Sequence, residues 1–83
     1  MEKVDNRLHE NIRILRALKG FTQKKLAAEF DILQSYYSRI ERGIIDPPST
    51  LLRKISEFYH VSVDSLIYTD LTKDVQIMTE KKK

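Results

Sequence analysis

The chain has 83 residues, of which 41% are hydrophobic and 33% charged, and this composition predicts one soluble globular domain with a small core and excludes a disordered chain. No apolar run approaches the roughly 18 residues of a membrane span, the polar N-terminus predicts no secretory signal, and the absence of cysteine excludes disulfides and thiolate metal sites. The net charge of +3 gives a mild bias toward polyanions, which is too weak to establish nucleic-acid binding alone.

The first predicted element is an amphipathic helix over residues 5 to 19. Its apolar residues recur at intervals of three and four, which places them on one helical face: Val4, Leu8, Ile12 and Leu15. Asp5 or Asn6 can cap the start of this helix. Gly20 can adopt the left-handed conformation that ends it, after which Phe21 enters the core.

Two shorter helices are predicted next, over about residues 23 to 30 and 34 to 42. Thr22 is a good N-cap for the first of them, which turns Leu26 and Ala27 inward. The second ends at Gly43 and buries Tyr37 and Ile40. Its other residues form a polar run that we expect to face solvent: Gln34, Ser35, Tyr36, Ser38 and Arg39. A short helix with this hydrogen-bonding and basic outer face is suited to the base edges of a DNA major groove.

The remaining helices follow a proline-containing loop. Asp46-Pro47-Pro48 excludes helix from the loop and places a helix start at Pro48 or Ser49. The inward residues of this fourth helix are Leu51, Leu52, Ile55, Phe58 and Tyr59. A turn at His60-Val61 follows, and Ser62 caps a last short helix that turns Val63, Leu66 and Ile67 inward.

Residues 69 to 83 differ in character and form a predicted C-terminal tail. Val75 and Ile77 alternate with polar neighbours, and Met78 follows before three lysines. This segment is interpretable as a short strand, a partner-binding segment or disorder. Disorder or weak order is the favoured interpretation, because so short a stretch cannot bury itself.

This arrangement resembles the helix-turn-helix domain of phage repressors and xenobiotic-response-element (XRE) type regulators, over roughly residues 8 to 67. The residues that carry the resemblance are spread over all the predicted helices: Arg16, Gly20, Thr22-Gln23, Leu26-Ala27, Ile40-Glu41, Gly43, Pro47, and Val61-Ser62-Val63-Asp64 followed by Leu66. The resemblance implies an all-α, five-helix, lambda-repressor-like domain over residues 5–68. It also implies a cytoplasmic transcriptional regulator, expected to be a repressor, that binds a double-stranded DNA operator as a homodimer.

The resemblance also assigns roles to particular residues. Gln23 stands where relatives contact a phosphate and support the recognition helix, and Arg16 and Glu41 match a buried salt bridge between helices one and three. The expected DNA-binding residues are Gln23, Lys24, Gln34, Ser35, Tyr36, Ser38, Arg39 and Arg42. Gln34 matches the N6/N7 edge of adenine and Arg39 suits guanine, although each has the alternative of simple solvation or a phosphate contact. Lys24, Lys25 and Arg42 are candidate phosphate contacts.

Four residues depart from the family pattern. Asp31 occupies a turn position where the family usually has glycine, and Leu33 replaces the usual Ser or Thr cap of the recognition helix, which leaves Asp31 as an alternative cap. Tyr37 replaces a β-branched core residue, so that its hydroxyl must reach the surface or a partner. His60 replaces a Gly or Asn at the end of helix four.

No pattern of residues indicates catalysis. His9 and His60 lack ligand spacing around them, and the sequence has neither a nucleophile triad nor a glycine-rich phosphate loop, so we expect no enzymatic activity, no metal and no cofactor. The fold leaves one alternative function open, an antitoxin-like or adaptor protein whose tail binds a protein partner. Within the DNA-binding class, a repressor, a phage-type switch, a restriction–modification controller and an antitoxin all stay open.

Overall fold

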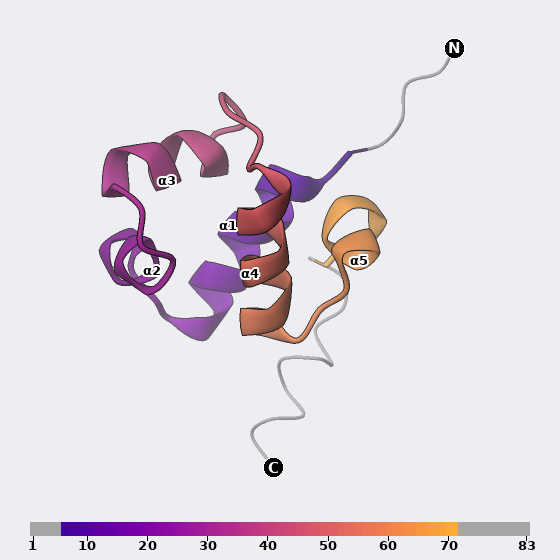
Figure 1. Cartoon of the computed structure of the whole chain (residues 1–83). Helices are drawn as coiled ribbons and strands as arrows, with labels where there is room; N and C mark the ends of the chain where they lie inside the picture. The colour runs from indigo at the N-terminus through magenta and orange to yellow at the C-terminus, as the bar shows by residue number, and fades with distance from the viewer. Residues whose placement is uncertain (1–5, 72–83) are drawn as a thin grey trace.

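The computed structural model describes residues 6–71, and these form five helices and no strand. The helices are α1 (Leu8–Lys19), α2 (Gln23–Glu29), α3 (Gln34–Glu41), α4 (Ser49–Tyr59) and α5 (Val63–Tyr68) (Figure 1). The all-α, five-helix prediction is therefore confirmed. Within the described residues, none of the helices has the length and apolar content needed to cross a membrane.

The helices surround one small core. α2 packs with α3, α1 packs with both α3 and α5, and α4 packs with α5. Figure 1 shows α2 and α3 on one side of α1 and α4, with α5 on the other side. All five helices and the segment after α5 supply buried apolar side chains: Leu8, Ile12, Leu15, Leu26, Ala27, Phe30, Tyr37, Ile40, Leu51, Ile55, Tyr59, Leu66 and Leu71.

The helix boundaries mostly follow the predicted caps, with one correction. Thr22 Oγ1 accepts a hydrogen bond from Lys25 N at 3.0 Å, and Ser62 Oγ accepts one from Ser65 N at 3.0 Å. α1 begins at Leu8, later than predicted: residues 6 and 7 are not helical, and the Asn6 side chain accepts a hydrogen bond from Leu8 N at 2.9 Å. Gly20 has φ 77°, the left-handed conformation predicted for the end of α1.

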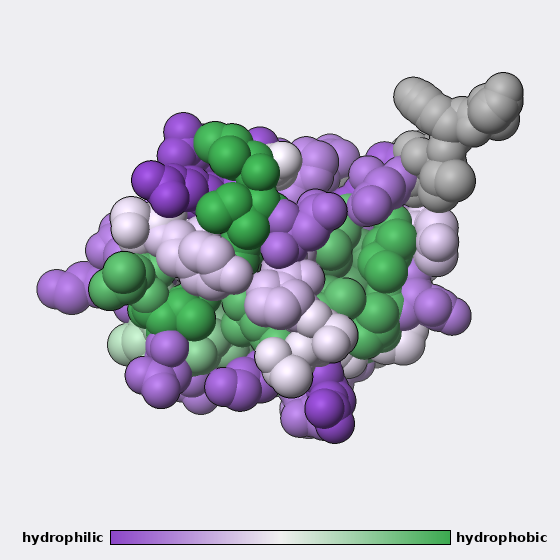
Figure 2. Space-filling view, turned by 45° about the horizontal axis from the view of Figure 1, so that its top comes forward, coloured by the Kyte–Doolittle hydropathy of each residue, from purple (hydrophilic) through white to green (hydrophobic). Residues whose placement is uncertain are grey.

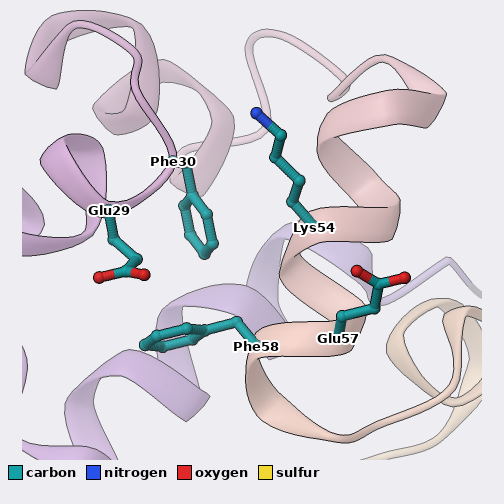
Figure 3. Close-up of a pocket in the computed structure, with 5 residues that line it drawn as sticks. All are labelled: Glu29, Phe30, Lys54, Glu57 and Phe58. Carbon is teal, nitrogen blue, oxygen red and sulfur yellow. The ribbon is translucent and has the colours of Figure 1, made fainter.

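Aromatic rings fill the space between α2 and α4. Phe58 lies edge-on to Phe30, with ring centroids 5.5 Å apart, and it also contacts Phe21 and Tyr59. Beside these rings lies an open hollow of about 290 Å³, lined by Glu29, Phe30, Lys54, Glu57 and Phe58 (Figure 3). This volume is at the lower limit for small-molecule pockets, and the hollow contains no residue of α3.

A buried asparagine attaches the end of the described chain to α1. Asn11, 1% exposed, donates hydrogen bonds to the carbonyl oxygens of Leu66 at 2.8 Å and Thr69 at 2.7 Å, and its Oδ1 accepts one from Leu71 N at 3.4 Å. Arg7 adds an ion pair with Asp70 at 3.7 Å. Residues 69 to 71, which are part of the predicted C-terminal tail, therefore pack on the domain. Val75, Ile77 and Met78 lie outside the described residues.

Candidate nucleic-acid interface

A charged junction fixes α3 against α1 and α2. Arg16 of α1 donates from Nε to Glu41 Oε2 at 2.6 Å and from Nη2 to Oε1 at 3.2 Å. Gln23 of α2 donates to Glu41 Oε1 at 3.0 Å, and Arg16 Nη1 also donates to the Phe21 carbonyl oxygen at 3.0 Å. One carboxylate thus joins α1 and α2 to the last turn of α3. The ion pair between Arg16 and Glu41 that the resemblance implied is present in the structure.

The junction keeps its charges despite being buried. The Glu41 side chain is 2% exposed and the Arg16 side chain 20%. Burial alone would raise the pKa of Glu41, but hydrogen bonds, led by the one from Arg16, outweigh burial and hold the pKa below its ordinary value. The hydrogen bond to Glu41 raises the pKa of Arg16 in turn. Both groups are therefore charged at neutral pH, and the pair is satisfied on both sides.

Two tyrosine hydroxyls lie at the edge of this junction. Tyr37 of α3 and Tyr59 of α4 are both buried, and neither hydroxyl has a hydrogen bond of ordinary geometry. Burial raises the pKa of both phenols, and the Glu41 carboxylate raises each one further. Of the two outcomes predicted for the Tyr37 hydroxyl, it does not reach the surface; its partner is the Glu41 carboxylate, and their interaction raises the pKa of Tyr37 and lowers that of Glu41. No sequence feature marks Tyr59 as part of this junction, since its helical spacing indicates only that it faces inward.

The turn between α2 and α3 contains two of the residues that depart from the family pattern, Asp31 and Leu33. Asp31 adopts the left-handed conformation with φ 59°, as expected of a residue in the usual glycine position. Leu33 occupies the N-cap position of α3, and no side chain caps the helix, so Asp31 does not replace the missing cap. At the other end Gly43 has φ 78°, and a Cβ there would lie 3.1 Å from the His9 ring, which leaves glycine as the residue that fits.

The residues predicted to bind DNA share a region that α2 and α3 build, but their exposure differs. Gln34, Ser35 and Arg39 are exposed on α3, Arg42 is exposed directly after it, and Lys24 is exposed on α2. The sequence predicts that Tyr36 and Ser38 face solvent. The structure corrects this prediction, because both residues are half-buried and Tyr36 packs against the core. Gln23 is half-buried, and its amide points inward to Glu41.

The exposed side of α3 is positively charged because the acidic residue of the helix is buried in the charged junction. Glu41 is the acidic residue of α3, and it is turned inward and paired with Arg16. Arg39 and Arg42 therefore remain on the outside without an acidic neighbour on the same helix. Lys25 of α2 lies over the Phe21 ring at 5.6 Å from its centroid, which fixes a further positive charge near the start of α2. The exposed polar residues of α3, together with Arg39 and Arg42, suit contact with a polyanion.

The fold and this surface define a helix-turn-helix protein. A family model described as helix-turn-helix matches residues 12–66, most of the chain. The chain therefore belongs to the XRE-type helix-turn-helix family of DNA-binding transcriptional regulators, a family without enzymatic activity.

The chain is similar in sequence to three HTH-type transcriptional regulators. It is 35% identical over 63 residues to the HTH-type transcriptional regulator ImmR of Bacillus subtilis, covering 76% of the chain and 50% of ImmR. It is 39% identical over 56 residues to the HTH-type transcriptional regulator SlrR of the same organism, covering 66% of the chain and 37% of SlrR. It is 31% identical over 64 residues to an uncharacterized HTH-type transcriptional regulator of Methanocaldococcus jannaschii, covering 76% of the chain and 97% of that protein.

The similarity covers only part of the length of two of these regulators. The chain spans about half of ImmR and less than half of SlrR. No solved structure matches the chain significantly.

Proposed function

We propose that this protein is a sequence-specific regulator, acting as a repressor, that inserts α3 into the major groove of operator DNA. The observation that carries the proposal is the division of α3 into two faces. Tyr37, Ile40 and Glu41 are buried and fix the helix in the fold, while Gln34, Ser35 and Arg39 are exposed. A helix held in this way presents hydrogen-bonding groups to base edges without first having to become ordered.

The proposed roles differ along the helix. Gln34 and Ser35 stand at the N-terminal end of α3, the end that contacts bases when such a helix enters the groove. Gln34 matches adenine, and Arg39 suits guanine or a phosphate. The proposed phosphate contacts are Lys24 and Arg42, with Gln23, Tyr36 and Ser38 completing the surface. Because the Gln23 amide donates to Glu41, its proposed role is mainly to support α3.

We further propose that the protein acts in the cytoplasm as a two-fold homodimer. Repression then follows from occupying a site that overlaps a promoter, since the family regulates transcription through DNA. The alternative that the protein mainly binds a protein partner depends on Val75, Ile77 and Met78, which lie outside the described residues. No observation on the described residues favours that alternative, so we do not propose it.

Selection of bound duplexes from a random pool tests the proposal. We expect one enriched sequence with two inverted half-sites whose centres lie about one helical turn, roughly ten base pairs, apart. The affinity for that duplex should fall steeply between about 50 and 200 mM salt, because each phosphate contact releases counterions. Failure to enrich any sequence, or an affinity that does not depend on salt, would contradict it.

A further inference from the structure

The N-cap of α3 carries a large apolar side chain where a capping side chain is expected. Leu33 is 74% exposed, the highest value among the large exposed hydrophobic residues of the described chain. It has no side-chain oxygen to accept a hydrogen bond from the first turn of α3, and the helix has no other side-chain cap. Figure 2, which tips the top of the molecule forward, shows apolar side chains exposed among hydrophilic ones on this face. Leu33 therefore serves neither the core nor the cap.

The position of Leu33 limits the groups of a bound DNA duplex that its side chain can contact. It directly precedes Gln34 and Ser35, at the end of α3 that lies nearest the base edges in a docked helix. The edges of the major groove present hydrogen-bond donors and acceptors and one apolar group, the C5-methyl of thymine. A leucine side chain placed against a donor or acceptor would leave that group without a partner, whereas against the methyl group it buries apolar surface on both sides.

We propose that Leu33 is a specificity-determining residue that recognises a thymine methyl group in each half-site. This inference rests on the proposed function, because it requires that α3 enters the major groove. It differs from the hydrogen-bonding role of Gln34 in chemistry and in the base feature recognised. It also accounts for an exposed leucine at a helix start that would be better capped by serine or threonine.

Substitution of thymine by deoxyuridine isolates the methyl group, because base pairing and every other groove atom stay the same. In the selected operator, each thymine is replaced singly and the dissociation constant is measured by fluorescence anisotropy. We expect at least one thymine per half-site at which wild-type affinity falls about fourfold, the factor for burying one methyl-sized group. The Leu33→Ser variant should lose this difference at that position only, since it has no apolar surface there and gains a cap.

Leu18→Ser is the matched control, because Leu18 is a 52% exposed leucine on α1, away from the α3 N-terminus in the chain. It should keep the full uracil penalty. Leu33→Ala is a second variant that removes the apolar side chain without adding a cap, and it should also lose the penalty. Thermal unfolding checks that all three variants are folded.

Three results would overturn the inference. The first is a wild-type protein that tolerates uracil at every thymine. The second is a penalty of unchanged size in Leu33→Ser, which would assign the methyl contact to another residue such as Tyr36. The third is a change of oligomeric state in Leu33→Ser with the penalty intact, which would make Leu33 a protein contact. In each of these cases the operator is still bound, whereas failure of the proposed function itself would leave no enriched duplex.

Discussion

Glu41 is the residue on which the position of α3 depends most. It is buried in the last turn of that helix and accepts hydrogen bonds from Arg16 and Gln23, so three helices meet at one carboxylate. A buried charge pair is not necessarily a large net gain in stability, because both partners lose water. Its effect is to favour one arrangement of the helices, since any shift of α3 would separate the charges.

Arg16→Ala tests how strongly the fold depends on this pair. Removing the guanidinium leaves Glu41 charged and buried, so we expect the free energy of unfolding to fall by about 3–5 kcal/mol. Urea denaturation followed by circular dichroism measures the loss. Arg13→Ala, which removes an exposed arginine from the same helix, should change stability by less than about 0.5 kcal/mol. Equal effects of the two substitutions would show that the pair contributes nothing specific.

The same carboxylate should make stability depend on pH. The pKa of Glu41 is lower in the folded protein than its ordinary value of 4.5, so ionised Glu41 favours the folded state. Its contribution is complete above the unfolded-state pKa and is lost as the pH falls through the folded-state pKa. We expect wild-type stability to decline below about pH 5, and the decline to be smaller in Glu41→Gln. Parallel pH profiles for the two proteins, measured by thermal unfolding, would contradict this.

At the scale of single helices, the sequence predicted most of what the structure contains. Periodic apolar residues located α1 and α4, and Thr22, Ser62 and Gly20 marked helix ends by chemistry that needs no distant partner. The partial burial of Tyr36 and Ser38 in α3 was harder to predict, because their sequence pattern is the same whether they face solvent or pack against a neighbouring helix. The inward amide of Gln23 could not be predicted either, since a carboxylate and a phosphate accept the same hydrogen bond.

His60 gives the clearest prediction at this scale, because it ends α4 in a left-handed conformation with φ 58°. A side chain with a Cβ is strained there, and glycine is not. We expect His60→Gly to raise the free energy of unfolding by about 0.5–1 kcal/mol, as measured by urea denaturation. His60→Ala keeps the Cβ and should give no gain. A gain of the same size in both variants would point to the loss of the imidazole as the cause.

Across the whole molecule, Asn11 joins the first helix to the end of the described chain. The sequence contained one indication of this role: Asn11 lies beside Ile12 on the apolar face of α1, where a polar residue must find buried partners. The hydrogen-bond partners of Asn11 depend on how α5 and Leu71 pack against α1. Local sequence patterns do not determine that packing. The placement of Leu71 in the core was missed for the same reason.

Asn11→Ala should therefore loosen the contact between the two ends of the described chain. The carbonyl oxygens of Leu66 and Thr69 would lose their partner, so we expect a loss of about 1–3 kcal/mol in the free energy of unfolding. Asn11→Asp keeps the shape but replaces the donor with an acceptor, and it should be at least as destabilising. Hydrogen exchange of the α5 amides would locate the effect, and unchanged exchange in both variants would contradict the role given to Asn11.

We propose that α3 contacts base edges from a position fixed by the rest of the fold, and Gln34→Ala tests this proposal most directly. Affinities of wild type and variant are compared for the selected operator and for a scrambled duplex. We expect Gln34→Ala to weaken operator binding by about 1–3 kcal/mol, while scrambled-duplex binding and the salt dependence stay unchanged. Glu57→Ala, an exposed change on α4, should alter neither. Equal weakening on both duplexes, or no weakening on the operator, would contradict the claim.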